Sequence, residues 1–471
     1  MKLTFYGGIN EIGGNKILLE EKNTAVFLDF GKGYKESSLF FEEFLNARTV
    51  HGIKDYLELD LIPKKEGIYR KDLIKILRDD EIDFFPHQHP SVDAILLSHG
   101  HLDHSGYTSF LDETIPVYLS RDSQIVMEAL KVIRPPSLEN EILEISYPHY
   151  LDCKKRKRIK RKIEVIQKEA ALKIKDLTVY PIFIDHSIPG ALMYLIKGKK
   201  EKILYSGDFR LSEILDERLK KICEFLKNEK IDFFLCEGTR VLDQNILKEG
   251  DVYLKAKKIV EEIEGLVVAD YSMSDVVRFK TLAKIARDTK RRIAVPYNYF
   301  GYLTLLAESG LAIEGIDDVA LYGKKKASLK KWEKDLLGKY NHIEAKEIRE
   351  NHRRYLVVLN FFQIQELIDL KPDNKSYFLR AITEPHSEEM ELSEERFANW
   401  IKHFNMKGLT PEGKFERAHV SGHISGKEIG WFIENIKPRA VIPIHTNQPE
   451  EFKKFHQKVI LLEKGECLNL S

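Results

Sequence analysis

Four side chains that can bind metal ions crowd into six residues of this chain, and no other feature constrains its fold as tightly. His99, His101, Asp103 and His104 lie in the run SHGHLDHSG, directly after the apolar segment VDAILLS, which predicts a buried strand. Zinc binds imidazole nitrogen and carboxylate oxygen at about 2.0–2.2 Å, and a loop leaving a strand end can direct alternating side chains toward two neighbouring ions. A chance cluster is a poor explanation, because crowded histidines repel one another when protonated and bury polar nitrogens when neutral. The sequence therefore predicts a metal site.

The charges of the chain nearly cancel, which excludes a globally basic or acidic protein. The 75 lysines and arginines against 74 aspartates and glutamates give a formal net charge of +1. Any site for a polyanion must therefore be a local patch. With 471 residues, 43% of them hydrophobic, the chain is long enough for a large core and predicts two domains.

The four cysteines, Cys153, Cys223, Cys236 and Cys467, are far apart and form no C-x-x-C pair. This spacing argues against a disulfide framework and against a thiolate zinc site. No apolar stretch approaches the roughly 20 residues that cross a bilayer, and the N-terminus does not have the pattern of a signal peptide. We expect a soluble, cytoplasmic protein that makes no use of a membrane.

The pattern of apolar residues changes twice along the chain. From the start, short β-branched runs separated by glycines predict a sheet. From about residue 210, alternating strands and amphipathic helices predict a parallel α/β sheet, and the first pattern returns near residue 412. We therefore expect a first domain split into 1–209 and 412–471 around an inserted domain at 210–411. Two highly charged excursions, 32–90 and 121–170, interrupt the first part, and the second of these is expected to be helical.

The pattern H-x-H-x-D-H in the cluster resembles the signature of the metallo-β-lactamase superfamily. Three further residues resemble other motifs of that superfamily: Asp29 in VFLDFG, His186 in FIDHSIPG and Asp208 in LYSGDFR. The resemblance implies an α/β fold, a sandwich with the layers αββα, in which Asp29 orients the metal loop through hydrogen bonds.

The same resemblance implies two zinc ions, with manganese as the alternative metal. One ion would be held by His99, His101, His186 and Asp208. The other would be held by Asp103, His104, His445 and the same Asp208, whose two carboxylate oxygens suit a bridging role. Taken alone, His186 is better explained as a hydrogen-bonded histidine at a strand end, and Asp208 as a turn residue. Their order along the chain and their flanking sequence reverse that preference.

Three residues late in the sequence resemble the motifs of the β-CASP group, the branch of the superfamily that cuts nucleic acids. They are Glu237 in CEGTR, His423 in HVSGHISG and His445 in IPIHTNQ. This resemblance implies that the inserted domain is a parallel α/β β-CASP domain. Asp103, His423 and Glu237 are then expected to serve catalysis, His423 by donating a proton to the leaving oxygen and Glu237 by holding a catalytic histidine.

Within the β-CASP group, the opening YGGINEIGGNKILLE and the ending HVSGH…IPIH are most similar to the ribonuclease J family. The resemblance implies hydrolysis of single-stranded RNA, threaded between the two domains, from the 5′ end, with endonucleolytic cutting as an accompanying activity. It also implies that His419 and Ser421 hold a nucleotide phosphate, although a turn or cap hydroxyl explains Ser421 equally well. Short family members lack a C-terminal oligomerising region, which leaves a homodimer as one alternative.

Other interpretations remain open at the level of sequence. An endonuclease of the RNA 3′-end cleavage or DNA-repair type is the first rival, and a non-catalytic RNA-binding pseudo-enzyme is the second. A small-molecule hydrolase gives no reason for an inserted domain. The run KKRKRIKRK at 154–162 predicts either an RNA-binding patch or a solvated helix balanced by nearby acids.

Overall fold

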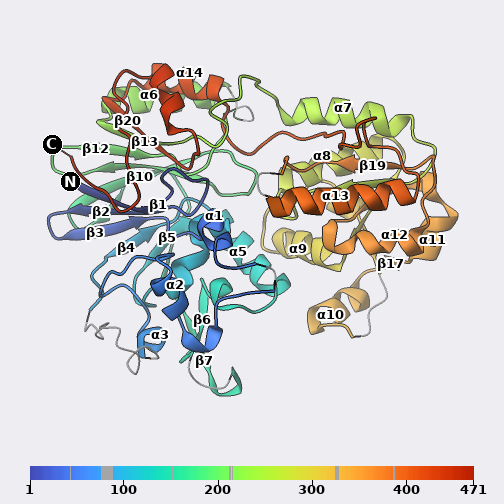
Figure 1. The fold of residues 1–471 in the computed structure, drawn as a ribbon, viewed down its shortest axis with the longest axis horizontal. Coiled ribbons are helices and arrows are strands. Elements are labelled where there is room, and N and C mark those ends of the chain that lie inside the picture. The colour runs from blue at the N-terminus through green and yellow to red at the C-terminus, as the bar shows by residue number, and fades with distance from the viewer. Residues whose placement is uncertain are drawn as a thin grey trace. The chain divides into compact units, whose positions relative to one another are not determined.

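The computed structural model places the chain in two compact units (Figure 1). One unit combines 1–246 with 422–471, and the other is formed by 247–421. The second unit is therefore inserted into the first. The structure describes residues 1–42, 44–75, 89–149, 153–211, 214, 216–323, 328–385 and 388–470.

The first unit contains two large β-sheets. The seven-stranded sheet has the order β21-β1-β2-β3-β4-β5-β8 and the six-stranded sheet the order β20-β13-β12-β11-β10-β9. The strands of the former are β1 (Lys2–Gly7), β2 (Lys16–Glu21), β3 (Thr24–Leu28), β4 (Ala94–Leu96), β5 (Val117–Ser120), β8 (Ile163–Ile166) and β21 (Cys467–Asn469). Those of the latter are β9 (Leu172–Ile174), β10 (Leu177–Phe183), β11 (Leu192–Lys197), β12 (Lys202–Tyr205), β13 (Phe233–Glu237) and β20 (Ala440–Ile444).

The two sheets pack face to face through one apolar core. Leu19 and Val26 of the first sheet belong to the same buried cluster as Val179, Tyr194 and Ile442 of the second. Strands buried on both faces need continuous apolar runs, which explains segments such as LMYLIK in β11.

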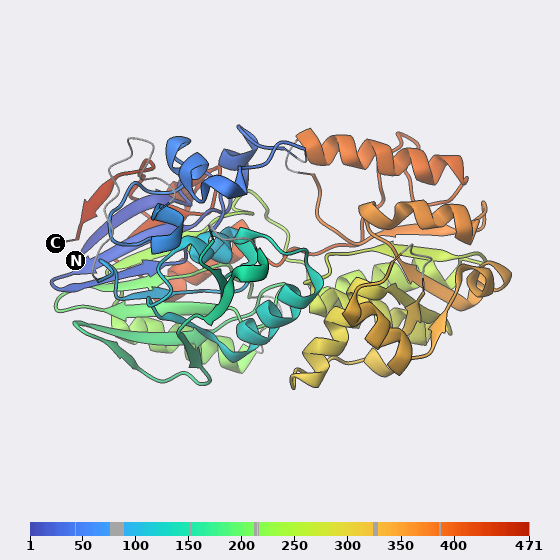
Figure 2. The same cartoon turned by 90° about the horizontal axis from the view of Figure 1, so that it is seen from below.

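Helices cover the outer faces of both sheets, so the expected αββα sandwich is confirmed (Figures 1 and 2). α6 and α14 pack on the six-stranded sheet, and α2, α3 and α5 on the seven-stranded one. The helices of this unit are α1 (Tyr34–Ser38), α2 (Lys54–Glu58), α3 (Lys71–Lys75), α4 (Leu102–Ser105), α5 (Arg121–Ile133), α6 (Asp216–Glu229) and α14 (Gly426–Ile436).

The inserted unit spans 247–421, so it begins and ends later in the chain than the expected 210–411. The reason is the position of β13, which pairs in parallel with β12 on one side and with β20 on the other. The segment IDFFLCEG was expected to be the first strand of the inserted α/β domain. In the structure it instead belongs to a sheet of the first unit.

The excursion at 121–170 is helical only in its first part, contrary to the expectation. After α5 the chain forms a separate two-stranded antiparallel sheet, β6 (Glu144–Tyr147) and β7 (Lys157–Lys160), and then β8. Isoleucine and valine alternate with charged residues in KRIK and IEVI, and this period of two suits half-buried strands better than a helix.

The second unit is built on one parallel sheet of six strands in the order β17-β16-β15-β18-β14-β19, as expected for the inserted domain. α13, in orange, and α9, in yellow, lie on opposite faces of it (Figure 2). The strands are β14 (Val267–Asp270), β15 (Arg292–Pro296), β16 (Ala320–Tyr322), β17 (His342–Ile343), β18 (Tyr355–Val358) and β19 (Tyr377–Arg380). The helices are α7 (Glu249–Glu261), α8 (Val276–Asp288), α9 (Tyr297–Glu308), α10 (Lys331–Lys339), α11 (Ala345–Glu350), α12 (Leu367–Leu370) and α13 (Glu388–His403).

The described part of the chain bears on the expectations about membrane segments and about cysteines. Among its helices, none combines the length and the apolarity that crossing a membrane requires. Cys223, Cys236 and Cys467 are free thiols, and the first two are buried.

One cation of the basic run 154–162 is structural. Arg161 is only 3% exposed, and its guanidinium donates hydrogen bonds to the carbonyl oxygens of Thr108 (3.1 Å), Leu111 (2.9 Å), Asp112 (2.8 Å) and Ile142 (2.9 Å). Burial lowers the pKa of Arg161 to about 10, which leaves it charged at neutral pH.

Replacing Arg161 by methionine should destabilise the first unit by about 3 kcal/mol or more, because four buried carbonyls lose their donor. Urea unfolding followed by far-UV circular dichroism measures the change. Lys160→Met, one residue away and exposed, is the control and should change stability by less than about 0.5 kcal/mol. Equal effects of the two substitutions would contradict the role of Arg161.

Candidate metal centre

The histidine cluster begins where β4 ends, as the sequence predicts. β4 pairs in parallel with β3, so the residues that follow the two strands, Ser98 and Asp29, meet at the same edge of the sheet. The chain then turns into the short helix α4, which carries Asp103 and His104. Asp29 adopts a left-handed backbone conformation (φ 57°), which directs its side chain under the cluster.

Asp29 is fully buried and accepts hydrogen bonds from three other elements. Its Oδ1 accepts from the Ser98 backbone N–H (2.6 Å), and its Oδ2 accepts from Ser98 Oγ (2.7 Å), Tyr205 Oη (2.5 Å) and His104 Nδ1 (2.7 Å). These contacts fix both the start of the cluster and the ring of His104.

Two glycines let other backbone segments approach Asp103 closely. A Cβ on Gly31 would lie 1.7 Å from the Asp103 carbonyl oxygen, and a Cβ on Gly13, which has a φ of 81°, would lie 2.8 Å from Asp103 Cβ. The glycine-rich opening of the sequence thus has a packing reason, since larger residues would displace Asp103.

Three histidines are oriented by a partner on Nδ1. His104 Nδ1 contacts Asp29, His186 Nδ1 donates to the Gly422 carbonyl oxygen (2.7 Å), and His445 Nδ1 lies 2.9 Å from Thr239 Oγ1. The Nε2 atoms of these rings are then directed toward one shared centre. A ligand histidine is commonly held in this way, with one nitrogen hydrogen-bonded and the other on the metal.

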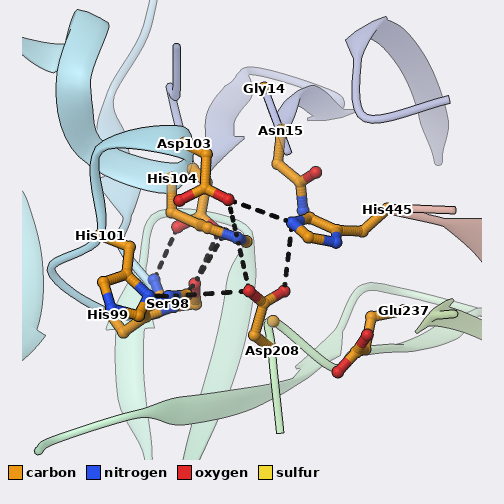
Figure 3. Close-up of polar contacts among 12 residues, drawn as sticks. Gly14, Asn15, Ser98, His99, His101, Asp103, His104, Asp208, Glu237 and His445 are labelled. Carbon is orange, nitrogen blue, oxygen red and sulfur yellow. Dashed lines mark hydrogen bonds and ion pairs between the residues drawn. The ribbon is translucent and has the colours of Figure 1, made fainter. Parts of the chain in front are cut away.

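Asp208 lies at the middle of the imidazole nitrogens (Figure 3). Its Oδ2 is 3.1 Å from His104 Nε2, 3.8 Å from His99 Nε2 and 3.9 Å from His186 Nε2. Its Oδ1 is 3.6 Å from His445 Nε2. One carboxylate therefore lies within 4 Å of these four imidazole nitrogens, three of them on the side of Oδ2 and one on the side of Oδ1.

The donor atoms fall into groups compact enough to surround a metal ion. In each group the possible ligand atoms lie within 4.8 Å of one another. The groups are His99 with His101 and His186; Asp103 with His104, Asp208 and His445; and Asp208 with Glu237, His423 and His445.

Two buried polar atoms at this centre fit a metal ion. Neither His104 Nε2 nor Asp208 Oδ1 has a hydrogen-bond partner, although both are inaccessible to solvent. Leaving such atoms unsatisfied is costly in a folded protein. A divalent cation between them would satisfy both, so the residues present fit a metal.

The protonation preferences of the histidines follow from burial and charge. Burial, with help from neighbouring imidazoles, lowers the pKa of His99 and of His186 well below the ordinary value, and burial lowers the pKa of His101 to about 4. These three rings are therefore neutral at pH 7, and neutral imidazole is the form that binds a metal.

His104 behaves differently because carboxylates surround it. Burial alone would lower the pKa of His104, but the charges of Asp208, Asp103 and Asp29 outweigh burial and raise that pKa. The centre therefore carries excess negative charge, which divalent cations would compensate.

His423 and Glu237 form a pair beside Asp208. His423 Nδ1 lies 3.1 Å from Glu237 Oε1 and 3.8 Å from Asp208 Oδ2, and its side chain is 20% exposed, whereas that of Glu237 is fully buried. Burial would lower the pKa of His423, but Glu237 and Asp208 outweigh it and raise the pKa to about 9. Glu237 is held in turn by the backbone N–H groups of Phe209 (3.3 Å) and Thr239 (3.1 Å).

The structure brings together most of the residues singled out in the sequence. His99, His101, Asp103, His104, His186, Asp208, Glu237, His423 and His445 converge, with Asp29 beneath them. His419 and Ser421 belong to the second unit, so their place beside the centre stays a prediction.

The sequence interpretation missed the residues that orient the ligands, namely Ser98, Tyr205 and Thr239. Ser98 and Thr239 adjoin recognised motifs, directly before His99 and two residues after Glu237. Tyr205 also stands within a quoted motif, LYSGDFR, but a tyrosine in an apolar strand gives no indication that its hydroxyl is used.

Comparison with known proteins agrees with this geometry. A family model described as "Beta-lactamase superfamily domain" matches residues 81–271. Ribonuclease J of Pyrococcus abyssi (strain GE5 / Orsay) is 23% identical and aligns with 94% of this chain and 89% of its own length. Ribonuclease J of Methanocaldococcus jannaschii is 21% identical, with 100% and 98% covered.

Other relatives are longer, and one solved structure shares the fold. The chain matches 43% of the length of ribonuclease J from Mycoplasma pneumoniae, at 23% identity over 62% of this chain. A crystal structure of a protein of unknown function from Enterococcus faecalis V583 superimposes with a TM-score of 0.72 at 21% identity, covering 100% of this chain and 99% of that one. The chain is therefore similar to the β-lactamase superfamily over residues 81–271 and to proteins named ribonuclease J over almost its whole length, and its αββα sandwich with an inserted parallel domain agrees with that similarity.

Proposed function

We propose that this protein is a metal-dependent ribonuclease that hydrolyses RNA phosphodiester bonds, with removal of nucleotides from the 5′ end as its main activity. The observation that carries the proposal is the His423–Glu237 pair next to Asp208, because it adds a proton donor to a centre suited to metals. The relatives named ribonuclease J support RNA as the substrate.

Two divalent ions, zinc or manganese, would share this centre. His99, His101 and His186 would hold one ion together with Asp208, whose Oδ2 lies 3.8 and 3.9 Å from Nε2 of His99 and of His186. Asp103, His104, His445 and Asp208 would hold the other. When bound, the ions supply Lewis-acid chemistry that polarises the phosphate and activates water for attack.

The residues of the chain supply the rest of the chemistry. Glu237 binds Nδ1 of His423 and orients the ring, so that Nε2 can give a proton to the leaving oxygen. Asp103 Oδ2 lies 3.3 Å from His445 Nε2, so that both atoms could face the same ion. His419 and Ser421 would bind the phosphate of a nucleotide next to the cut.

Substitution of Asp29 by asparagine should weaken metal binding by about 10- to 100-fold without unfolding the protein. An amide has one acceptor oxygen, whereas Asp29 accepts from Ser98, Tyr205 and His104 through two. Competition with a chromophoric chelator measures the affinity. Asp93→Asn is the control, because Asp93 binds Ala25 N and Lys175 away from the centre; the same loss in both variants would contradict the role of Asp29.

Replacing His423 by alanine should reduce kcat by about 10²- to 10⁴-fold, the usual contribution of general acid catalysis, while the metal content stays unchanged. Metal analysis and single-turnover cleavage of labelled RNA measure the two quantities. His403→Ala, which removes an exposed histidine at the end of α13, serves as the control. Unchanged turnover in His423→Ala would remove this residue from the mechanism.

The substrate and direction are tested with RNA that carries a 5′-monophosphate, a 5′-triphosphate or a 5′-hydroxyl, alongside internally labelled RNA and matched single-stranded DNA. We expect mononucleotides from the 5′-monophosphate RNA, no product after dialysis against a chelator, and recovery when zinc or manganese is restored. Internal fragments alone, or a preference for DNA, would instead indicate an endonuclease. An inert protein after metal restoration would refute the proposed function.

A further inference from the structure

A strongly basic hairpin formed by β6 and β7 has no part in the metal centre, although it belongs to the same unit. Eight of the nine residues 154–162 are lysine or arginine. The antiparallel register places Arg158 opposite Ser146 and Lys160 opposite Glu144. β6 and β7 lie at the lower end of the first unit in Figure 1, below α2 and α5.

Along this basic run, side chains that pack against the protein alternate with side chains that face the solvent. Ile159 lies opposite the fully buried Ile145, and Arg161, two residues further on, is buried among carbonyl oxygens. Neighbouring strand residues point to opposite faces, so Arg158 and Lys160 point outward.

Lys162 follows two residues after the end of β7 and adds a third exposed cation. The side chains of Arg158 and Lys162 are 77% and 62% exposed. Residues two apart in a strand, such as Arg158 and Lys160, are separated by about 6.6–6.8 Å. Successive phosphates of an extended single strand have a similar separation, so these two cations can each meet a phosphate, and Lys162 adds positive charge beyond them.

The carboxylates nearby neutralise this face only in part. Glu144 pairs with Arg158 (3.4 Å) and with Lys131 of α5, and Glu164 pairs with Lys162 (3.4 Å). Exposed ion pairs of this kind are weak, so they do not prevent the cations from binding a polyanion. Lys155 and Lys157 add further exposed positive charge beside these cations.

A small cavity of about 20 Å³ in the first unit lies between the metal loop and the segment that leads into β6. Gly100 and Leu102, which alternate with the histidines of the cluster, line it together with Lys131, Arg134 and Leu143, and Leu143 directly precedes β6. Two cations, Lys131 and Arg134, are therefore among the residues that separate the metal loop from the hairpin.

From these observations we propose that Arg158, Lys160 and Lys162 form a binding surface for the phosphate backbone of single-stranded RNA outside the metal centre. This inference rests on the proposed function, because it takes the RNA to be the substrate that the centre cleaves. Each phosphate contact releases counterions, and binding through the surface is independent of base sequence.

The test compares a triple variant, Arg158→Gln, Lys160→Gln and Lys162→Gln, with a control of equal charge change on α6, Lys220→Gln, Lys221→Gln and Lys227→Gln. All six side chains are exposed, and glutamine keeps most of the stem. Fluorescence anisotropy gives Kd for single-stranded RNA of about 30 nucleotides between about 50 and 200 mM salt. Cleavage of the same RNA is followed in parallel, and vesicles containing anionic lipid are included as a second polyanion.

Loss of these three cations should lower the slope of log Kd against log salt by about 2 and weaken binding about 10-fold or more at the lowest salt, with a matching rise in KM. The α6 control should leave slope and affinity close to those of the unchanged protein. Equal slopes in the two variants, or a loss confined to the anionic vesicles, would overturn the inference. If the unchanged protein binds RNA but does not cleave it, the proposed function fails, whereas the slope difference still decides the binding surface.

Discussion

The whole centre depends on one buried carboxylate, that of Asp29. Through four hydrogen bonds it joins the end of β3 to the start of the histidine cluster, to a ring of α4 and to a tyrosine of β12. A buried carboxylate is tolerated only when hydrogen-bond donors surround it. Asp29 therefore holds these partners in place, and the stability of its buried charge in turn requires them. The position of His104 follows from that requirement, and that of Asp208 opposite it follows from the pairing of β11 with β12.

The residues that the sequence singled out as metal ligands lie together in the structure, and most of them stand close to a strand end within a short recognisable motif. His99, His186 and His445 follow strands with clear apolar runs, and parallel or neighbouring strands bring their ends to the same edge of a sheet. The resemblance to the metallo-β-lactamase superfamily implied the αββα sandwich, and the alternation of strands and amphipathic helices predicted the parallel sheet of the insertion.

Other features depend on tertiary contacts that no local pattern reveals. The pairing of β13 with β20 shifts the division of the chain, and that pairing joins segments separated by the whole inserted unit. The charged segment after α5 resembles a surface helix in composition, yet isolated isoleucines anchor it as strands. Tyr205 is the clearest case, since only the folded arrangement shows that its hydroxyl reaches Asp29.

The late position of β20 has a consequence for how the protein folds during synthesis. This strand lies next to β13 and directly precedes His445, so the six-stranded sheet and the donor groups around Asp208 can be completed only after the whole inserted unit has been synthesised. Domains generally fold in the order in which they emerge, and the inserted unit can therefore fold while its host is still open. The order of synthesis thus places the closing of the host sheet after the folding of the unit inserted into it.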